Sequence, residues 1–431
     1  MILPPTPPPL PLDVVVLNDF AHVQGGGSKV AILSARALAA RGSRVLFFAA
    51  AGPVDPELAA SGVRVVCLGQ PDILADPSRL RGAARGLWNG AAAAALGREL
   101  RALDPARTVV HVHGWMKALS SSVIRAALDR AFPVVVTLHD YSAVCPNGGF
   151  YNYRTERACR LRPMSAACLA TDCDLRSYAH KLWRVARQAV QSGPGRLISG
   201  VRHFVCISGT NRALHAPHLP AAAQMHFVPN PIAVERGPPA RPERSRLFAA
   251  VGRLAAEKGV RLFAAAAREA GAEALFVGDG YLREEIGRIN PQARITGWVG
   301  PRMVARYLAR CRALVFASQW PETQGLAVLE AAARGVPAIV SDGSAAREWV
   351  EHGVTGLLFR SGDREDLRRR IAELADDAAV ARLGRNAYER FWADPPTPER
   401  HAQALERLYR RILNGEESWQ QERAEAERRR A

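Results

Sequence analysis

Two carboxylates in a short glycine-containing segment have the residue types and the spacing to bind sugar hydroxyls. The segment W-P-E-T-Q-G-L-A-V-L-E places Glu322 and Glu330 on either side of Gly325. If a helix begins near this glycine, the free N–H groups around Gln324, Gly325 and Leu326 form an anion site that the helix dipole strengthens. The segment could then bind a phosphate between two diol-binding carboxylates.

A strand–loop–helix–strand order would position these carboxylates. Strand-like runs at residues 313–318 and 337–341 flank the segment, an order that builds a parallel sheet. Glu322 would then lie on a loop at the carboxyl end of a strand, where open α/β sheets bind ligands. Glu330 would lie about one and a half turns into the helix. On spacing alone, two surface glutamates remain the alternative.

A pair of cations follows an earlier strand-like run at residues 247–251. The sequence V-G-R-L-A-A-E-K-G then places Arg253 and Lys258 between two glycines. At a strand-to-helix turn such a pair suits a diphosphate, because arginine forms bidentate contacts and lysine supplies a point charge. Two ordinary surface cations are the alternative.

The first half of the chain opens with a similar unit. An apolar run at residues 13–17 leads into a loop that contains Gly25 and Gly26, followed by an expected helix at 28–41 and strand at 44–49. Consecutive glycines let a backbone approach a ligand closely. The loop is not G-x-G-x-x-G, so a dinucleotide fingerprint is absent, and a merely flexible loop is the alternative.

Histidines close two further predicted strands. The runs at residues 108–113 and 134–139 end in His113 and His139, and Asp140 follows the second. A histidine at the carboxyl end of a parallel strand faces the ligand crevice, where it can donate to a hydroxyl or a phosphate. A lone histidine is more often structural.

Four of the seven cysteines lie in an insertion expected at about residues 141–177. Cys145, Cys159, Cys168 and Cys173 are spaced C-x13-C-x8-C-x4-C, without the C-x2-C pairs of common zinc sites. In a reducing compartment such a cluster indicates a structural zinc or reduced thiols, and disulfides are disfavoured. Both the zinc hypothesis and the reduced-thiol alternative stay open.

The next segment is an expected amphipathic helix at residues 176–191. Apolar residues such as Leu182 and Trp183 are mixed there with basic ones such as Lys181 and Arg187. A helix of this kind can lie on an anionic membrane surface. The favoured alternative is a helix that packs on the core and exposes a basic face to solvent.

The composition narrows the class of protein. The chain has 431 residues, of which 48% are hydrophobic, so it can form two or three domains with full cores. A net charge of +17 suggests an anionic partner, but nothing resembles an RNA-binding motif and nucleic acid is not expected. No apolar run approaches the roughly 20 residues of a membrane-spanning helix. The start lacks signal-peptide features, so a cytoplasmic location is expected.

The positions of the predicted strands divide the chain. We expect a proline-rich leader, a first α/β domain, a linker, a second α/β domain, a C-terminal helix and a charged tail. Their expected bounds are 1–12, 13–232, 233–245, 246–395, 396–413 and 414–431. In both domains strands alternate with helices, which predicts parallel sheets.

Taken together, these motifs resemble the retaining family-4 glycosyltransferases of GT-B fold, over about residues 13–395. The most specific are G-R-L-A-A-E-K-G at 252–259, V-G-D-G at 277–280, P-E-T-Q-G-L-A-V-L-E-A at 321–331 and G-V-P-A-I-V-S at 335–341. The first half adds the glycine-rich loop and T-L-H-D-Y-S-A-V-C-P-N. The resemblance implies two Rossmann-like parallel-sheet domains that face a central cleft, with the cysteine-containing insertion in the first.

The resemblance also implies how a nucleotide-diphosphate-sugar donor is held. Arg253 and Lys258 would bind the diphosphate, and Glu330 would bind the ribose hydroxyls. Gly25 and Gly26 would close on the phosphates. No D-x-D pair is evident at a strand end, and these cations would take the place of a catalytic metal.

The remaining implied contacts lie at the donor sugar. Glu322 would contact the sugar near its reacting face, and His139 would hold the sugar or steady the leaving group. Members of the family often have an aromatic residue two positions after the first motif glutamate, where this chain has Gln324. The identity of the donor sugar therefore stays open.

The implied reaction is transfer of the sugar, with retention, to a saccharide or lipid-linked acceptor in polysaccharide or glycolipid synthesis. The basic first half fits a cytoplasmic enzyme that is peripheral on the inner face of the membrane. Two alternatives stay open. One is a nucleotide-sugar epimerase or hydrolase of the same fold, and the other is a non-catalytic scaffold that binds an anionic surface.

Overall fold

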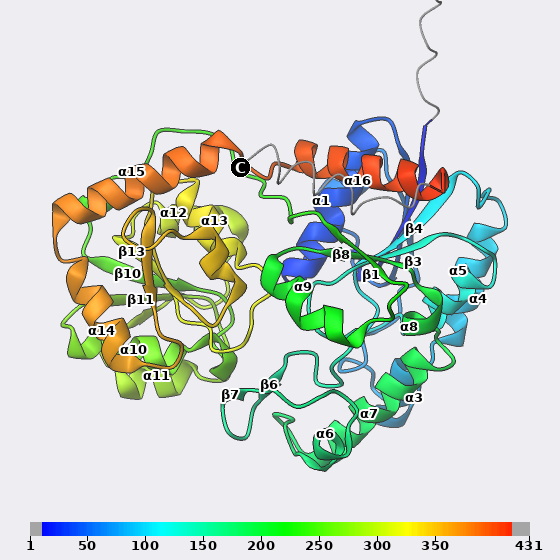
Figure 1. The fold of residues 1–431 in the computed structure, drawn as a ribbon, viewed down its shortest axis with the longest axis horizontal. Helices are drawn as coiled ribbons and strands as arrows, with labels where there is room; N and C mark the ends of the chain where they lie inside the picture. Colours follow the sequence, from blue (N-terminus) through cyan, green and yellow to red (C-terminus); the bar gives the residue numbers. More distant parts are fainter. Residues whose placement is uncertain (1–10, 416–431) are drawn as a thin grey trace, which may run out of the picture.

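The computed structural model describes residues 11–415, which form two α/β units side by side (Figure 1). The expected leader 1–12 and tail 414–431 lie almost entirely outside the described residues. Each unit is built on a parallel sheet, which confirms the predicted fold class.

The first unit contains a seven-stranded sheet in the order β3-β2-β1-β4-β5-β8-β9. Its strands are β1 (Asp13–Phe20), β2 (Arg44–Ala51), β3 (Arg64–Cys67), β4 (Thr108–Val112), β5 (Val134–Thr137), β8 (His203–Cys206) and β9 (Gln224–Phe227). All eight residues of β1 are buried, as expected for a central strand that helices cover on both faces.

The first unit also contains helices, some on the two faces of this sheet and one in the insertion. They are α1 (Gly26–Ala40), α2 (Pro56–Ala59), α3 (Arg79–Leu87), α4 (Gly90–Leu100), α5 (Ser122–Leu128), α6 (Ala166–Ala170), α7 (Tyr178–Ser192), α8 (Leu197–Gly200), α9 (Gly209–His215) and the 3-10 turn η1 (Ala216–His218). Val15 of β1 packs with α4 and α5 on one face, whereas Val14 and Val16 pack with α1 on the other.

The second unit contains a six-stranded sheet in the order β12-β11-β10-β13-β14-β15. Its strands are β10 (Leu247–Val251), β11 (Glu273–Val277), β12 (Arg294–Ile295), β13 (Ala313–Phe316), β14 (Ala338–Ser341) and β15 (Gly356–Phe359). Its helical elements are η2 (Pro242–Arg244), η3 (Ala256–Lys258), α10 (Val260–Glu269), α11 (Arg283–Ile289), α12 (Pro301–Leu308), α13 (Leu326–Ala332), η4 (Ala345–Trp349), α14 (Arg364–Glu373) and α15 (Asp377–Ala393).

Both sheets reverse their strand order at one point. The reversal lies between β1 and β4 in the first sheet and between β10 and β13 in the second. In open parallel sheets the loops at the carboxyl ends diverge at such a point and leave a crevice for a ligand. The fold therefore predicts a site after β1, β4, β10 and β13.

The cysteine-containing insertion lies at the foot of the first unit in Figure 1. It contains an antiparallel hairpin of β6 (Tyr151–Asn152) and β7 (Arg157–Ala158), followed by α6. Helix α7 follows the insertion. The prediction that this helix exposes a basic face to solvent is wrong. Its buried residues are Lys181, Arg187, Gln188 and Gln191, so the charged and polar side of this helix faces inward.

The last helix, α16 (Pro398–Leu413), returns from the second unit and lies beside α1 (Figure 1). Its residues Ala402, Leu405, Leu408 and Tyr409 are buried in the same core cluster as β1. The first unit is thus completed by residues that are distant from it in the sequence.

Replacing Leu405 with alanine is expected to destabilise the first unit. Leu405 is fully buried between α16 and the sheet, and large-to-small core changes of this kind cost about 2–5 kcal/mol of unfolding free energy. Chemical denaturation of the full chain measures the loss. The matched control is Arg407→Ala, an exposed position of the same helix, where a change within about 0.5 kcal/mol is expected. Equal stability of both variants would contradict the packing of α16 described above.

Candidate functional site

A cleft of about 810 Å3 lies between the two units. It is bounded by loops at the carboxyl ends of β1, β4 and β5 on one side and of β10, β11 and β13 on the other. Of the residues predicted to form the site, Gly25, Gly26, His139, Arg253 and Lys258 line this cleft. The other predicted site residues, Glu322, Gln324, Gly325, Leu326 and Glu330, are not among the lining residues. Each of the two glutamates contacts a lysine.

The glycine-rich loop lies against both His139 and the motif segment. Gly25 has a φ of +154° and precedes the first residue of α1. A Cβ atom at Gly26 would lie 3.6 Å from Leu326 Cδ1, and one at Gly27 would lie 3.5 Å from the ring of His139. The small size of the loop residues lets these three segments meet at one end of the cleft.

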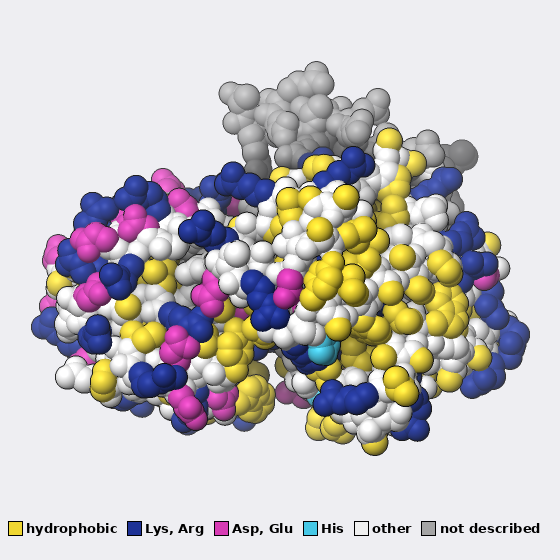
Figure 2. Space-filling model, turned by 90° about the horizontal axis from the view of Figure 1, so that it is seen from below, with side chains coloured by type: hydrophobic (Ala, Val, Ile, Leu, Met, Phe, Trp, Pro, Cys, Tyr) yellow, Lys and Arg dark blue, Asp and Glu magenta, His cyan; other side chains and the backbone are white. Residues whose placement is uncertain are grey.

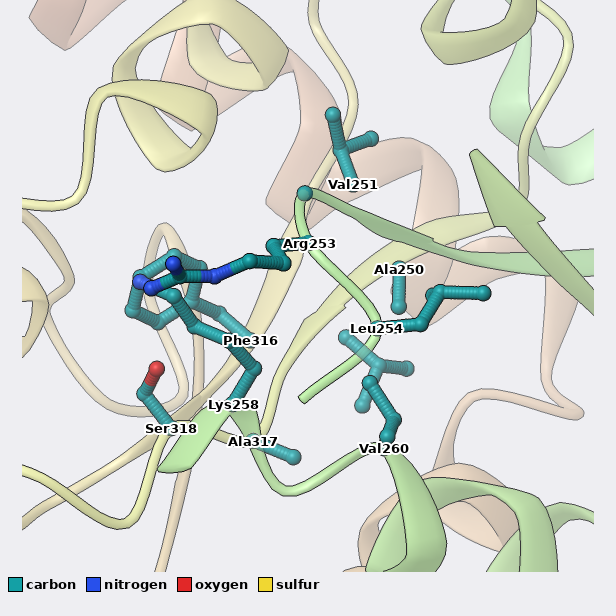
Figure 3. Close-up of a pocket in the computed structure, with 11 residues that line it drawn as sticks. Ala250, Val251, Arg253, Leu254, Lys258, Val260, Phe316, Ala317 and Ser318 are labelled. Carbon is teal, nitrogen blue, oxygen red and sulfur yellow. The ribbon is translucent and has the colours of Figure 1, made fainter. Parts of the chain in front are cut away.

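The loop after β10 carries the two predicted diphosphate cations. Arg253 and Lys258 extend to the same side of this loop, toward Phe316 and Ser318 (Figure 3). Gly259 follows with a φ of +65°, and a Cβ there would lie only 1.9 Å from the carbonyl oxygen of Ala317. Only glycine permits this approach, which brings the loop against the end of β13.

Lys258 forms an ion pair with Glu322 as a consequence of this approach. Glu322 is 7% exposed and also accepts a hydrogen bond from Ser318 Oγ at 2.7 Å. Burial raises the pKa of Glu322, but the charge and hydrogen bond of Lys258, together with hydrogen bonds from Ser318 and Trp320, outweigh it, so the pKa is lowered overall. Glu322 is therefore a carboxylate at neutral pH, and the lysine ammonium lies 5.1 Å from the centre of the Trp320 ring.

Arg253 also has an acidic partner, because its Nη2 donates to Glu257 Oε1 at 2.8 Å. The arginine side chain is two-thirds exposed to the cleft, at 66%, whereas that of Glu257 is 3% exposed. The carboxylate thus binds one terminal nitrogen of the guanidinium, Nη2. The remaining N–H groups can bind an anion.

Glu330 lies in α13 and pairs with a lysine of the other unit. Lys29 Nζ is 2.8 Å from Glu330 Oε1. Sequence reasoning missed Lys29, although its place just after the glycine-rich loop was a usable signal. The predicted ribose-binding carboxylate is therefore part of a bridge between the two units.

Further contacts attach the motif segment to the first unit. Tyr141 donates its hydroxyl to the carbonyl oxygen of Pro321 at 2.7 Å. Thr323 Oγ1 donates to the carbonyl oxygen of His139 at 2.8 Å. These contacts also went unpredicted. Every residue has a backbone carbonyl, so residue types do not show which carbonyl will accept a hydrogen bond.

Gln324 is buried without internal partners. The residue is 2% exposed, and neither its amide nitrogen nor its amide oxygen has a hydrogen-bonding partner among residues 11–415. A buried amide without partners costs free energy that a polar ligand can recover. Gln324 is thus the strongest local indication that the segment is completed by a bound molecule.

His139 is linked to His113 by a hydrogen bond of 2.9 Å between His139 Nε2 and His113 Nδ1. Burial, followed by the charge of His401, lowers the pKa of His139 to about 3, so the ring is neutral at neutral pH. Nε2 of His113 is buried and has no partner among the described residues. Buried N–H groups without partners are rarer than buried bare acceptors, which favours a proton on His113 Nδ1.

This preference fixes the tautomer of His139. If His113 Nδ1 donates, His139 Nε2 must accept, and the proton of His139 lies on Nδ1. His139 then presents an N–H donor from a ring that lines the cleft. The third histidine, His111, does not reach the cleft, because it bonds Tyr409 at 2.6 Å and Thr137 at 2.7 Å.

The cysteines of the insertion surround a buried lysine. Lys181 is 1% exposed, and its Nζ lies 3.5 Å from Cys168 Sγ and 3.3 Å from Cys173 Sγ. Across residues 11–415, no group of three or more metal-binding side chains is arranged to hold an ion. With an ammonium between two of the sulfurs, the cysteines as placed do not fit a zinc ion.

Two families match the chain by sequence. Residues 24–236 match the family described as Glycosyltransferase Family 4, and residues 245–377 match the one described as Glycosyl transferases group 1. A GDP-mannose-dependent alpha-mannosyltransferase of Corynebacterium glutamicum is 31% identical over 140 residues, which are 32% of this chain and 34% of that protein. The glycogen synthase of Mycobacterium tuberculosis is 28% identical over 312 residues, 65% of this chain and 71% of that protein.

Solved structures support the same architecture. A sucrose-phosphate synthase from Thermosynechococcus elongatus has a TM-score of 0.68 at 19% identity, over 94% of this chain and 100% of that one. An Anabaena protein in complex with UDP-glucose has a TM-score of 0.63 at 17% identity, over 92% and 99%. The chain spans only 34% of the first curated relative that it matches.

Nuclear magnetic resonance of protein labelled with 15N-histidine can test the tautomer. We expect His139 to carry its proton on Nδ1, with the signal assigned by its loss in His139→Gln. His113→Leu removes the donor, so the two tautomers of His139 should then mix. His113→Asn retains an N–H donor and should preserve the native tautomer. A native His139 protonated on Nε2 would contradict the arrangement.

Proposed function

The chain belongs to the family-4 glycosyltransferases of GT-B fold, and on this premise we propose that it transfers a sugar, with retention, from a nucleotide-diphosphate-sugar donor to a saccharide or lipid-linked acceptor. The observation that carries the proposal is the pairing of Lys258 with Glu322 beside Arg253. Two cations that we propose bind the diphosphate thus lie next to a carboxylate that could bind sugar hydroxyls.

The diphosphate of the donor would bind Arg253 and Lys258. Arg253 retains free N–H groups that suit a phosphate, and Lys258 can share its ammonium between Glu322 and a phosphate oxygen. The start of α13 at Leu326 adds backbone N–H groups and the positive end of the helix dipole. The proposed site needs no divalent metal, because these groups neutralise the charge.

The ribose would bind Glu330, and the base would lie near Trp298. Lys29 now holds the Glu330 carboxylate, so the ribose hydroxyls would join or displace this contact. Trp298 lines the cleft and is 76% exposed. An aromatic face open to a cleft offers a stacking surface for a nucleotide base.

The donor sugar would meet Glu322, Gln324 and His139. The unpartnered amide of Gln324 can bond two sugar hydroxyls, and His139 can donate from Nδ1. This combination would select a donor sugar with hydroxyls on the side of Gln324. An aromatic residue at that position would make no such selection. The names of the relatives include mannosyl and glycogen synthesis, which supports a hexose donor and a role in polysaccharide or glycolipid synthesis.

Bond cleavage at the anomeric carbon transfers negative charge to the departing diphosphate. Arg253, Lys258 and the amino end of α13 stabilise this charge without moving, which is how a preorganised site lowers a barrier. The contacts of Tyr141 and Thr323 across the cleft hold the two units together over the donor. Exclusion of water by this closure favours transfer over hydrolysis.

We also infer a cytoplasmic location, with the enzyme peripheral on the inner face of the membrane. All seven cysteines are free, which suits a reducing compartment.

Replacing Glu322 with glutamine, or Arg253 or Lys258 with alanine, is expected to lower transfer at least about a hundredfold while the fold survives, as for loss of a preorganised charge-stabilising group. A thermal-shift screen with UDP-, GDP- and ADP-sugars first identifies the donor, because the true donor stabilises the chain most. Release of the nucleoside diphosphate then measures turnover.

The matched control is Arg294→Ala, an exposed arginine of the second unit that pairs with Glu273 away from the cleft; its turnover should be native. Near-native turnover in all three site variants would reject the proposal. Rapid conversion of the donor without any acceptor would instead indicate the epimerase or hydrolase alternative.

A structural zinc in the insertion stays a hypothesis, and the contacts of Lys181 weigh against it. We expect seven titratable thiols per unfolded chain and zinc well below one equivalent, because the lysine ammonium already lies between Cys168 and Cys173. Elemental analysis of protein purified without chelator and thiol titration measure both quantities. One zinc per chain would overturn this expectation and restore the zinc hypothesis.

A further inference from the structure

Helix α7 is amphipathic, but it buries its polar side and exposes its apolar side, the opposite of an ordinary surface helix. Its exposed positions include Tyr178, Ala179, Leu182, Ala186 and Ala189, which recur every three or four residues and form one apolar stripe. Tyr178 is 39% exposed and Leu182 is 46% exposed. A helix normally buries such a stripe, so its exposure needs an explanation.

The polar side of α7 has specific partners inside the protein, which fixes the helix in this orientation. Lys181 contacts the two cysteine sulfurs. Arg187 donates to the carbonyl oxygen of Met116, Gln188 to that of Ala143 and Gln191 to that of Ser142, at 3.2, 3.0 and 2.7 Å. Rotating the apolar stripe inward would break all of these bonds and leave buried polar groups unpaired.

Helix α3 extends the apolar stripe. It packs against α7 at Gly86, where an added Cβ would lie 2.8 Å from the Trp183 ring. Leu80 of α3 is 85% exposed and Leu74 just before it is 53% exposed. Figure 2 shows hydrophobic side chains gathered over the first unit, on the side where α6 and α7 lie in Figure 1. We call Leu74, Leu80, Leu175, Tyr178 and Leu182 the apolar face.

Most of the charge near the apolar face that lacks a partner of opposite sign is positive. Asp72 is an exception, and its carboxylate accepts hydrogen bonds from the backbone N–H groups of Leu74 and Ala75. Asp76, Asp172 and Asp174 nearby are each already paired with an arginine. By contrast, exposed arginines of the same region form no ion pair within the described part of the chain. They are Arg79, Arg160, Arg162 and Arg176. The second unit in Figure 2 instead mixes basic and acidic side chains.

We propose that the apolar face and these arginines dock the enzyme on an anionic lipid bilayer. The apolar side chains would enter the boundary between headgroups and acyl chains, and the arginines would bind lipid phosphates. A second copy of the chain fits this surface poorly, because it would bring unpaired arginines against one another. Among residues 11–415, no helix has the length and apolarity to cross a bilayer.

Docking at this surface gives the cleft access to an acceptor embedded in the same membrane. That purpose rests on the proposed function and selects the lipid-linked acceptor over a free saccharide. The docking itself depends only on the surface of the first unit.

Vesicle co-sedimentation of the full chain tests the proposal. Vesicles of phosphatidylcholine mixed with phosphatidylglycerol should bind the protein, more weakly as salt rises, and vesicles of phosphatidylcholine alone should bind it much less. The double variant Leu80→Gln, Leu182→Gln should lower the partition coefficient at least about tenfold. Arg160→Gln and Arg176→Gln should each lower it about fivefold.

The control is Val354→Gln, which removes an exposed apolar side chain, 39%, from the second unit and should bind as the native chain does. Transfer to a short water-soluble acceptor should be unchanged in every variant, which separates docking from catalysis. Vesicle binding that follows this pattern supports the surface even where no transfer occurs, in which case only the proposed function fails.

Three results would overturn the proposal. The native chain could fail to bind anionic vesicles, or the double leucine variant could bind them as tightly as the native chain. Light scattering could also show a dimer that the leucine changes dissociate, which would make the apolar face an interface between copies.

Discussion

The ion pair of Lys258 and Glu322 is the interaction around which the second unit's side of the cleft is organised. It joins the loop after β10 to the loop after β13 at the point where the strand order reverses. Gly259 allows the approach, and burial makes the pair stronger than a surface contact. Both groups are thus poised to exchange part of their mutual contact for a ligand.

The site belongs to the assembly of the two units and to neither unit alone. Lys29 reaches Glu330 across the cleft, and Tyr141 and Thr323 add hydrogen bonds between the units. These contacts all involve the segment that carries the two carboxylates. If the donor binds Glu330 as proposed and replaces the contact of Lys29, it would change the balance of free energy that holds the units together.

The sequence was most informative where the signal is local. Apolar runs located the strands, and the end of one run located His139. Glycines next to charged residues located the loop that carries Arg253. The long-range pairings of Lys258 with Glu322 and of Lys29 with Glu330 could not be predicted, because no periodic pattern encodes which loops meet. The orientation of α7 was predicted wrongly for a related reason. Burial of Lys181 and Arg187 depends on partners in the insertion and in the β4 loop, and a helical pattern alone favours burying Leu182.

The return of α16 to the first unit has a consequence for biosynthesis. The core around β1 gains Leu405 and Tyr409 only after the whole second unit has been translated. At about 5–20 residues per second, the nascent first unit waits on the order of tens of seconds with an apolar groove uncovered. During that time the ribosome-bound chain exposes apolar surface that is prone to aggregation, and chaperones would have to cover it. A chain that stopped anywhere in the second unit would lack α16, and its groove would stay uncovered. Folding of the first unit is therefore complete only when the last helix has been synthesised.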